Sequence, residues 1–115
     1  MTFVKKGVVL PLGSTNDFDN VHTFAPSVLY HNGKFYLYYT GNDGSTDRAG
    51  LAISKDGVTF VKKGVVLPLG SANDFDDVHT YAPSVLYHNG KFYLYYVGND
   101  GSNYRVGLAI SKDGL

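Results

Sequence analysis

The sequence contains no cysteine, no tryptophan and only one methionine. Without cysteine the chain forms no disulfide and offers no thiolate for catalysis, and the redox state of its compartment stays open. An excess of charge of one sign is also missing, because 10 basic side chains balance 10 acidic ones. Nucleic acid and membranes are therefore disfavoured as partners.

Long hydrophobic runs are missing as well. The opening residues, MTFVKKGVVLPLG, include too few consecutive apolar residues for a signal-peptide core or a membrane-spanning helix. We therefore expect a soluble chain without an export signal, in a compartment that the sequence does not define. No cofactor is predicted.

An internal repeat dominates what is present. Residues Thr2–Val58 align with Thr59–Leu115 with only eight differences. The differing pairs are Thr15/Ala72, Asn20/Asp77, Phe24/Tyr81, Thr40/Val97, Thr46/Asn103, Asp47/Tyr104, Ala49/Val106 and Val58/Leu115. Such self-similarity predicts stacked units, as in a solenoid or a propeller. The near identity of the copies indicates recent duplication or deliberate construction, and we favour a designed or reconstructed fragment.

Each unit is predicted to form four antiparallel strands in a meander. Asn89-Gly90 is a two-residue signal for a type I′ hairpin between strands at Ala82–His88 and Lys91–Gly98. A third strand is expected at Arg105–Lys112, and Val58–Val66 is expected to supply the fourth strand after the first copy.

The strand at Lys91–Gly98 has bulky, largely apolar side chains on both faces, which indicates a sheet covered on both sides. Propeller blades are packed in this way and have repeats of similar length. We therefore predict an all-β fold with two propeller blades per chain. Blade repeat 1 spans residues 2–58, outer strand first, and blade repeat 2 spans residues 59–115.

The phase of the repeat predicts assembly. The chain opens on an outer strand, Thr2–Val9, and stops at Leu115, where that strand would begin again. Because propellers have about four to eight blades, we expect homo-oligomerisation in which chains exchange this strand to close a ring. A trimer with six blades is preferred, and a dimer with four blades is the alternative. The expected assembly contacts are Thr2, Phe3, Val4, Gly114 and Leu115.

The stretch HTYAPSVLYHNGKFYLYYVGNDGS, followed by VGLAISKDG, resembles a blade of the glycosidase-type propellers of glycoside hydrolase families 43, 32, 62, 68 and 130. The resemblance implies a funnel with a general-base Asp, an auxiliary Asp and a general-acid Glu on different blades. Ala25-Pro26-Ser27 and Ala82-Pro83-Ser84 place serine where the resemblance implies the auxiliary Asp, and the chain has no glutamate. Glycoside hydrolysis needs two carboxyl groups flanking the bond, so we predict no catalytic residue and no enzymatic activity.

Two loops, NDFDNVH and NDFDDVH, hold the candidate ligand-binding residues of an axial channel or funnel. These residues are His22, His79, Asp19, Asp76, Asp17 and Asp74. Their side chains include metal-ligand types, but Asn and Asp also cap turns through the backbone. We prefer the turn interpretation and predict no metal site.

Three functions follow from these observations. The first is a self-assembling two-blade unit with a structural role and no catalysis. The second is a carbohydrate-binding ring that takes a small sugar. The third is a remnant of a glycoside hydrolase.

Overall fold

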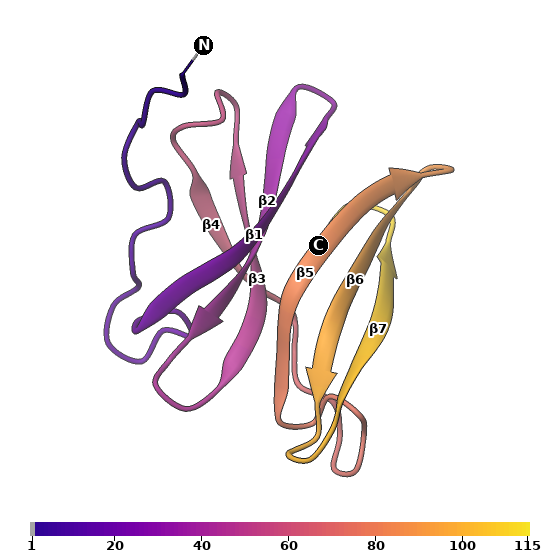
Figure 1. Ribbon diagram of the computed structural model, residues 1–115. Helices are drawn as coiled ribbons and strands as arrows, with labels where there is room; N and C mark the ends of the chain where they lie inside the picture. The colour runs from indigo at the N-terminus through magenta and orange to yellow at the C-terminus, as the bar shows by residue number, and fades with distance from the viewer. Residues whose placement is uncertain (1) are drawn as a thin grey trace.

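The computed structural model describes residues 2–115 as two antiparallel sheets packed side by side (Figure 1). The first sheet has the order β1-β2-β3-β4, and the second has the order β5-β6-β7. Their strands are β1 (His22–His31), β2 (Lys34–Asn42), β3 (Asp47–Ser54), β4 (Val61–Leu67), β5 (His79–His88), β6 (Lys91–Asn99) and β7 (Tyr104–Ser111). The described part of the chain includes no helix that is long and apolar enough to cross a membrane.

The predicted hairpin turns are confirmed. Asn32 and Gly33 have φ of 50° and 78°, and Asn89 and Gly90 have φ of 50° and 77°. These positive angles are those that a type I′ turn requires at both central positions. The strand that precedes the second turn begins at His79 rather than at Ala82.

A bulge interrupts the pairing of the innermost strands, β1 and β5. The register shifts between Phe24 and Ser27, and again between Tyr81 and Ser84. Ala82 lies in the second bulge with φ of 50°, a strained angle for a residue with a Cβ. The bulge frees the Ala82 amide from the sheet ladder, so that it can bond to the neighbouring sheet.

The prediction of a strand at Thr2–Val9 is wrong for the single chain. Residues Thr2–Val8 have no regular structure and are exposed, although the identical letters at Thr59–Val65 run into and form most of β4. The difference lies in the neighbours, because β4 pairs with β3 along one edge. The second sheet has three strands within residues 2–115, and its completion by an outer strand from another chain stays a prediction.

The core consists of two apolar clusters on the two faces of the first sheet. One cluster fills the space between the sheets and includes Tyr38, Leu51 and Leu94. The other joins Leu10 to Leu37 and Tyr39, on the face along which the N-terminal segment runs (Figure 1). The first sheet is therefore covered by the second sheet on one face and only in part by the N-terminal segment on the other, whereas the far face of the second sheet is open.

Candidate functional site

Asp19 is the centre of a buried polar cluster in the first sheet and is only 2% exposed. Its Oδ2 accepts hydrogen bonds from the Tyr39 hydroxyl at 2.8 Å and pairs with Lys62 Nζ at 2.8 Å. The loop that delivers Asp19 is closed by a bond from Gly13 N to the Asp19 carbonyl oxygen at 3.1 Å. The buried carboxylate thus has both a hydrogen-bond donor and a cation, as burial of a charge demands.

Asp76 occupies the same position in the second sheet, but its cluster is incomplete. It is 8% exposed, and its Oδ2 accepts a hydrogen bond from the Tyr96 hydroxyl at 2.8 Å. Among residues 2–115, no lysine or arginine forms an ion pair with it. The reason is the missing strand, since the lysine that pairs with Asp19 comes from β4.

Asp17 and Asp74 cap turns. The Oδ2 atom of Asp17 accepts a bond from Ser14 N at 2.7 Å, and that of Asp74 accepts one from Ser71 N at 2.8 Å. Both side chains are used in the way that Asp is used in many turns, by accepting a nearby backbone N–H. They are exposed and lie in the loops that lead into β1 and β5, in different sheets.

The two histidines begin the innermost strands, His22 in β1 and His79 in β5. His22 is exposed, whereas His79 lies between the sheets and its Nδ1 accepts a bond from Asp47 N at 3.1 Å. Within residues 2–115, no group of three or more His and Asp side chains is placed to hold a metal ion. The single chain does not gather the six candidate residues at one point, so an axial site that contains them stays a prediction.

The sequence analysis did not single out Lys62, although this residue forms the ion pair with Asp19. A signal is present in the alternation of β4, because two adjacent residues of a strand point to opposite faces of the sheet. Either Lys62 or Lys63 must therefore face the neighbouring side chains. Lys62 does so: its Nζ also bonds to the carbonyl oxygen of Pro11.

Side chains and backbone amides join the two sheets through a set of hydrogen bonds, which we call the sheet junction. In the first of these bonds the Tyr38 hydroxyl donates to the carbonyl oxygen of Gly114 at 2.6 Å. Gly114 is one of the predicted assembly residues, and this bond fixes its position. The other four bonds run from Val85 N to Ser27 Oγ at 3.1 Å, Ala82 N to Thr40 Oγ1 at 2.8 Å, Ala49 N to Thr80 Oγ1 at 3.4 Å, and Asp47 N to His79 Nδ1 at 3.1 Å.

The face of the first sheet that packs in the junction has an equivalent face on the second sheet, which points away from the first sheet and is exposed. We call this face the open face. Tyr38, Ala49 and Leu51 are 2%, 0% and 0% exposed in the junction. Their repeat equivalents on the open face, Tyr95, Val106 and Leu108, are 42%, 74% and 46% exposed. Clusters of exposed apolar side chains of this kind are typical of surfaces that bind a protein, a membrane or a ligand.

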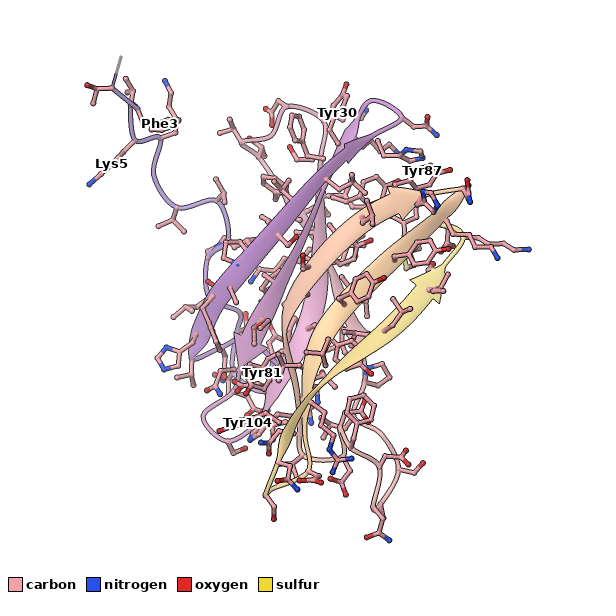
Figure 2. All side chains as sticks on the ribbon, turned by 45° about the vertical axis from the view of Figure 1, so that its right-hand side comes forward. Phe3, Lys5, Tyr30, Tyr81, Tyr87 and Tyr104 are labelled. Carbon is pink, nitrogen blue, oxygen red and sulfur yellow. The ribbon has the colours of Figure 1, made fainter. Side chains whose placement is uncertain are left out.

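A second exposed apolar surface lies at the other end of the chain. It is a groove of about 220 Å³ on the first sheet, on the side away from the second sheet. Its lining residues are Val8, Val9, Leu10, Thr23, Phe24, Pro26, Leu37 and Tyr39. Phe3, one of the predicted assembly residues, projects into solvent away from the sheets, and the nearby Lys5 does the same (Figure 2).

The buried tyrosines predict a loss of stability at alkaline pH. Burial, followed by the hydrogen bond to Asp76 and its charge, raises the pKa of Tyr96 from 10.0 to about 12. Burial and the bond to Asp19 raise the pKa of Tyr39 as well. Because the fold favours the neutral phenols, their contribution to the free energy of unfolding should be fully present below pH 10 and should be lost as pH rises from 10 through 12. Urea unfolding between pH 8 and 12 measures this, and Tyr96→Phe should flatten the decline; an unchanged slope would contradict the assignment.

A family model described as the glycosyl hydrolases family 32 N-terminal domain matches residues 1–114. The chain is 36% identical over 92 residues to a sucrose-6-phosphate hydrolase of Bacillus subtilis, covering 74% of this chain and 18% of the relative. It is 41% identical over 83 residues to a probable arabinan endo-1,5-alpha-L-arabinosidase C of Aspergillus fumigatus, covering 70% of this chain and 25% of the relative. The chain thus spans about a quarter or less of the length of these two enzymes.

Solved structures of β-propeller glycoside hydrolases have the same fold. A family 117 glycoside hydrolase from Zobellia galactanivorans superposes with a TM-score of 0.78 at 22% identity, covering 93% of this chain and 40% of that chain. A thermostable family-43 glycoside hydrolase superposes with a TM-score of 0.67 at 26% identity, covering 89% and 33%. The expected all-β propeller fold and the resemblance to glycosidase-type propellers are confirmed.

Proposed function

The chain belongs to the family of the glycosyl hydrolases family 32 N-terminal domain, and from this premise we propose that it is a two-sheet propeller unit that assembles with further copies of itself, in a structural role without catalysis. One observation carries the proposal. Within residues 2–115 the second sheet lacks the strand that β4 supplies to the first, while an identical sequence, Thr2–Leu10, begins as an exposed coil.

Two further features support self-association. The strand β7 ends the second sheet with an unpaired edge, and such edges bind other strands readily. The open face and the groove defined above lie at opposite ends of the chain and are both apolar. Complementary surfaces at opposite ends favour a head-to-tail contact, which closes into a ring when its rotation divides a full turn. The near identity of the repeats fits a deliberately constructed scaffold.

Size-exclusion chromatography with light scattering tests this proposal directly. We expect the 115-residue chain, of 12.5 kDa, to elute as a trimer with three times this mass, or as a dimer with twice this mass. A single species of 12.5 kDa over a wide range of concentrations would overturn the proposal.

Carbohydrate binding is the second candidate function. Tyr81 and Tyr104 lie close together at the same end of the second sheet (Figure 2), with ring centroids 6.3 Å apart in an edge-on arrangement. Exposed aromatic rings provide apolar faces with a polar hydroxyl at the edge, which suits the stacking of a sugar ring. The first repeat has Asp47 in place of Tyr104, so this pair of rings belongs to the second repeat alone.

Calorimetric titration with arabinose, xylose and mannose oligomers separates the two functions. Saturable binding that is lost in Tyr104→Asp, which restores the residue of the first repeat, would support the sugar site. Absence of heat with all three sugars favours the structural role. The third candidate, a hydrolase remnant, is supported by the family alone, and the lack of glutamate weighs against it; hydrolysis of aryl glycosides by the pure chain would revive it.

A further inference from the structure

We propose that Thr2–Leu10 of a second copy pairs with β7 as the fourth strand of the second sheet, and that Lys5 of that copy forms the missing ion pair with Asp76. This inference rests on the proposed self-association and specifies the register and the residues of the contact. The template for it is present inside the chain, where β4 completes the first sheet.

The register follows from the pairing of β3 with β4. There, Ile53 lies opposite Val61 and Ala49 lies opposite Leu67. The repeat equivalents on β7 are Ile110 and Val106, and the equivalents of the β4 residues are Val4 and Leu10. Ile110 of one copy is therefore expected opposite Val4 of the other, and Val106 opposite Leu10.

The carboxylate of Asp76 provides the polar anchor for this strand. Asp19 and Asp76 occupy equivalent places and accept equivalent tyrosine hydroxyls at 2.8 Å, but only Asp19 has a lysine partner. Lys5 is the repeat equivalent of that partner, Lys62, and is exposed in the single chain. A buried carboxylate that lacks a cation gains most from a charge delivered by an incoming strand.

Leu10 is already in position for this contact. It packs against Leu37 and Tyr39 in the first sheet, as its equivalent Leu67 packs in the cluster with Leu94 and Tyr96. Leu67 fills the junction between two sheets, and Leu10 lines the groove that is open to solvent. The second copy therefore needs no rearrangement beyond Thr2–Val9 to receive the open face of the first.

The junction bonds also predict how the contact between copies differs from the one inside the chain. Three of the four bonds to side-chain acceptors have complete equivalents, with Ser84, Thr23 and His22 as acceptors. The fourth does not, because Val97 replaces Thr40 and leaves the Ala25 amide of the second copy without its hydroxyl acceptor. The repeats also differ at Asp47/Tyr104 and Ala49/Val106, where the second repeat has the larger and more apolar residue. The contact between copies is thus more apolar and has one hydrogen bond fewer.

Cysteine crosslinking tests the register, because the chain has no cysteine of its own. Val4→Cys combined with Ile110→Cys should give disulfide-linked dimers and larger species on mild oxidation, since directly opposed strand residues fit disulfide geometry. Val4→Cys with Val106→Cys is the matched control and should not crosslink, because the two residues would lie about 13 Å apart along the strand. Ile53→Cys with Val61→Cys should form a disulfide within one chain.

Two single substitutions test the residues. Lys5→Met should raise the dissociation constant of the assembly about 30-fold by leaving Asp76 unpaired, whereas Lys6→Met, with the same change of charge, should leave it unchanged. Val97→Thr should lower the constant several-fold by restoring the missing acceptor, a gain that misfolding would not produce. Lys5 and Lys6 both lie in the exposed coil, so neither change affects the fold of the single chain.

The outcomes separate this inference from the proposed function. Assembly in light scattering without the Val4–Ile110 crosslink, or with equal effects of Lys5→Met and Lys6→Met, would overturn the inference and leave self-association intact. The crosslink in a chain that elutes as a monomer would support the strand contact and contradict the closed ring. Absence of both assembly and crosslink would overturn both.

Discussion

Gly50→Ala is expected to lower the free energy of unfolding by about 3 kcal/mol, because the new methyl group overpacks a site that has no room for it. A Cβ at Gly50 would lie 2.4 Å from Phe18 Cζ and 3.0 Å from the backbone oxygen of Gly64. The ring cannot move aside freely, since it also covers Gly41 and packs on Tyr39 with centroids 5.8 Å apart. Urea unfolding followed by circular dichroism measures the loss.

A second substitution identifies the ring as the cause. Phe18→Leu shortens the side chain that meets the new methyl group, so the double variant Gly50→Ala/Phe18→Leu should lose less stability than the sum of the single losses. Gly107→Ala should be harmful in the same way, because its Cβ would lie 2.5 Å from Phe75 Cζ. Additive losses in the double variant would show that the backbone of Gly50, rather than the ring, sets the cost.

Lys62→Met should lower the free energy of unfolding by about 3 kcal/mol, because breaking a buried ion pair from one side leaves an unpaired buried charge. The stranded group is Asp19, which would keep only the Tyr39 hydroxyl at 2.8 Å. The methionine retains most of the apolar stem of the lysine, so the loss reports the charge rather than the packing. Urea unfolding at neutral pH is the measurement.

The neighbouring lysine supplies the control. Lys63→Met removes the same charge from an exposed position of β4 and should change stability by no more than about 0.5 kcal/mol. Asp19→Asn in the Lys62→Met background removes the stranded charge and should recover part of the loss. Equal effects of the two lysine substitutions would contradict the ion pair as a source of stability.

Local rules were sufficient to predict much of the fold. Asn32-Gly33 and Asn89-Gly90 need positive φ, which few residues adopt, so the hairpins were predicted from two letters each. The strand β4 is predicted as the fourth strand of the repeat and follows the turn at Asp56-Gly57. In that turn Asp56 Oδ1 accepts bonds from Val58 N and Thr59 N at 2.9 Å.

The rest could not be predicted, because it depends on partners far away in the sequence. Asp17 and Asp19 are two residues apart and look alike as ligands, yet one caps an exposed turn and the other is buried against Tyr39 and Lys62. Asp19 is buried because its loop folds onto the first sheet. The sequence of the loop has no periodic pattern that predicts this contact. The exposed coil at Thr2–Val8 is a second example, since the identical sequence at Thr59–Val65 forms most of β4 only because β3 lies beside it.

The duplicated stretch gives this molecule an internal reference for measurements. Thr2–Val8 and Thr59–Val65 have the same letters, but only the second copy includes most of the ordered strand β4. The same substitution made at both equivalent positions would therefore measure the effect of that residue on stability once without a neighbouring strand and once with it. Subtracting the two changes in unfolding free energy isolates the worth of the strand environment for each residue, free of the intrinsic preference of the side chain.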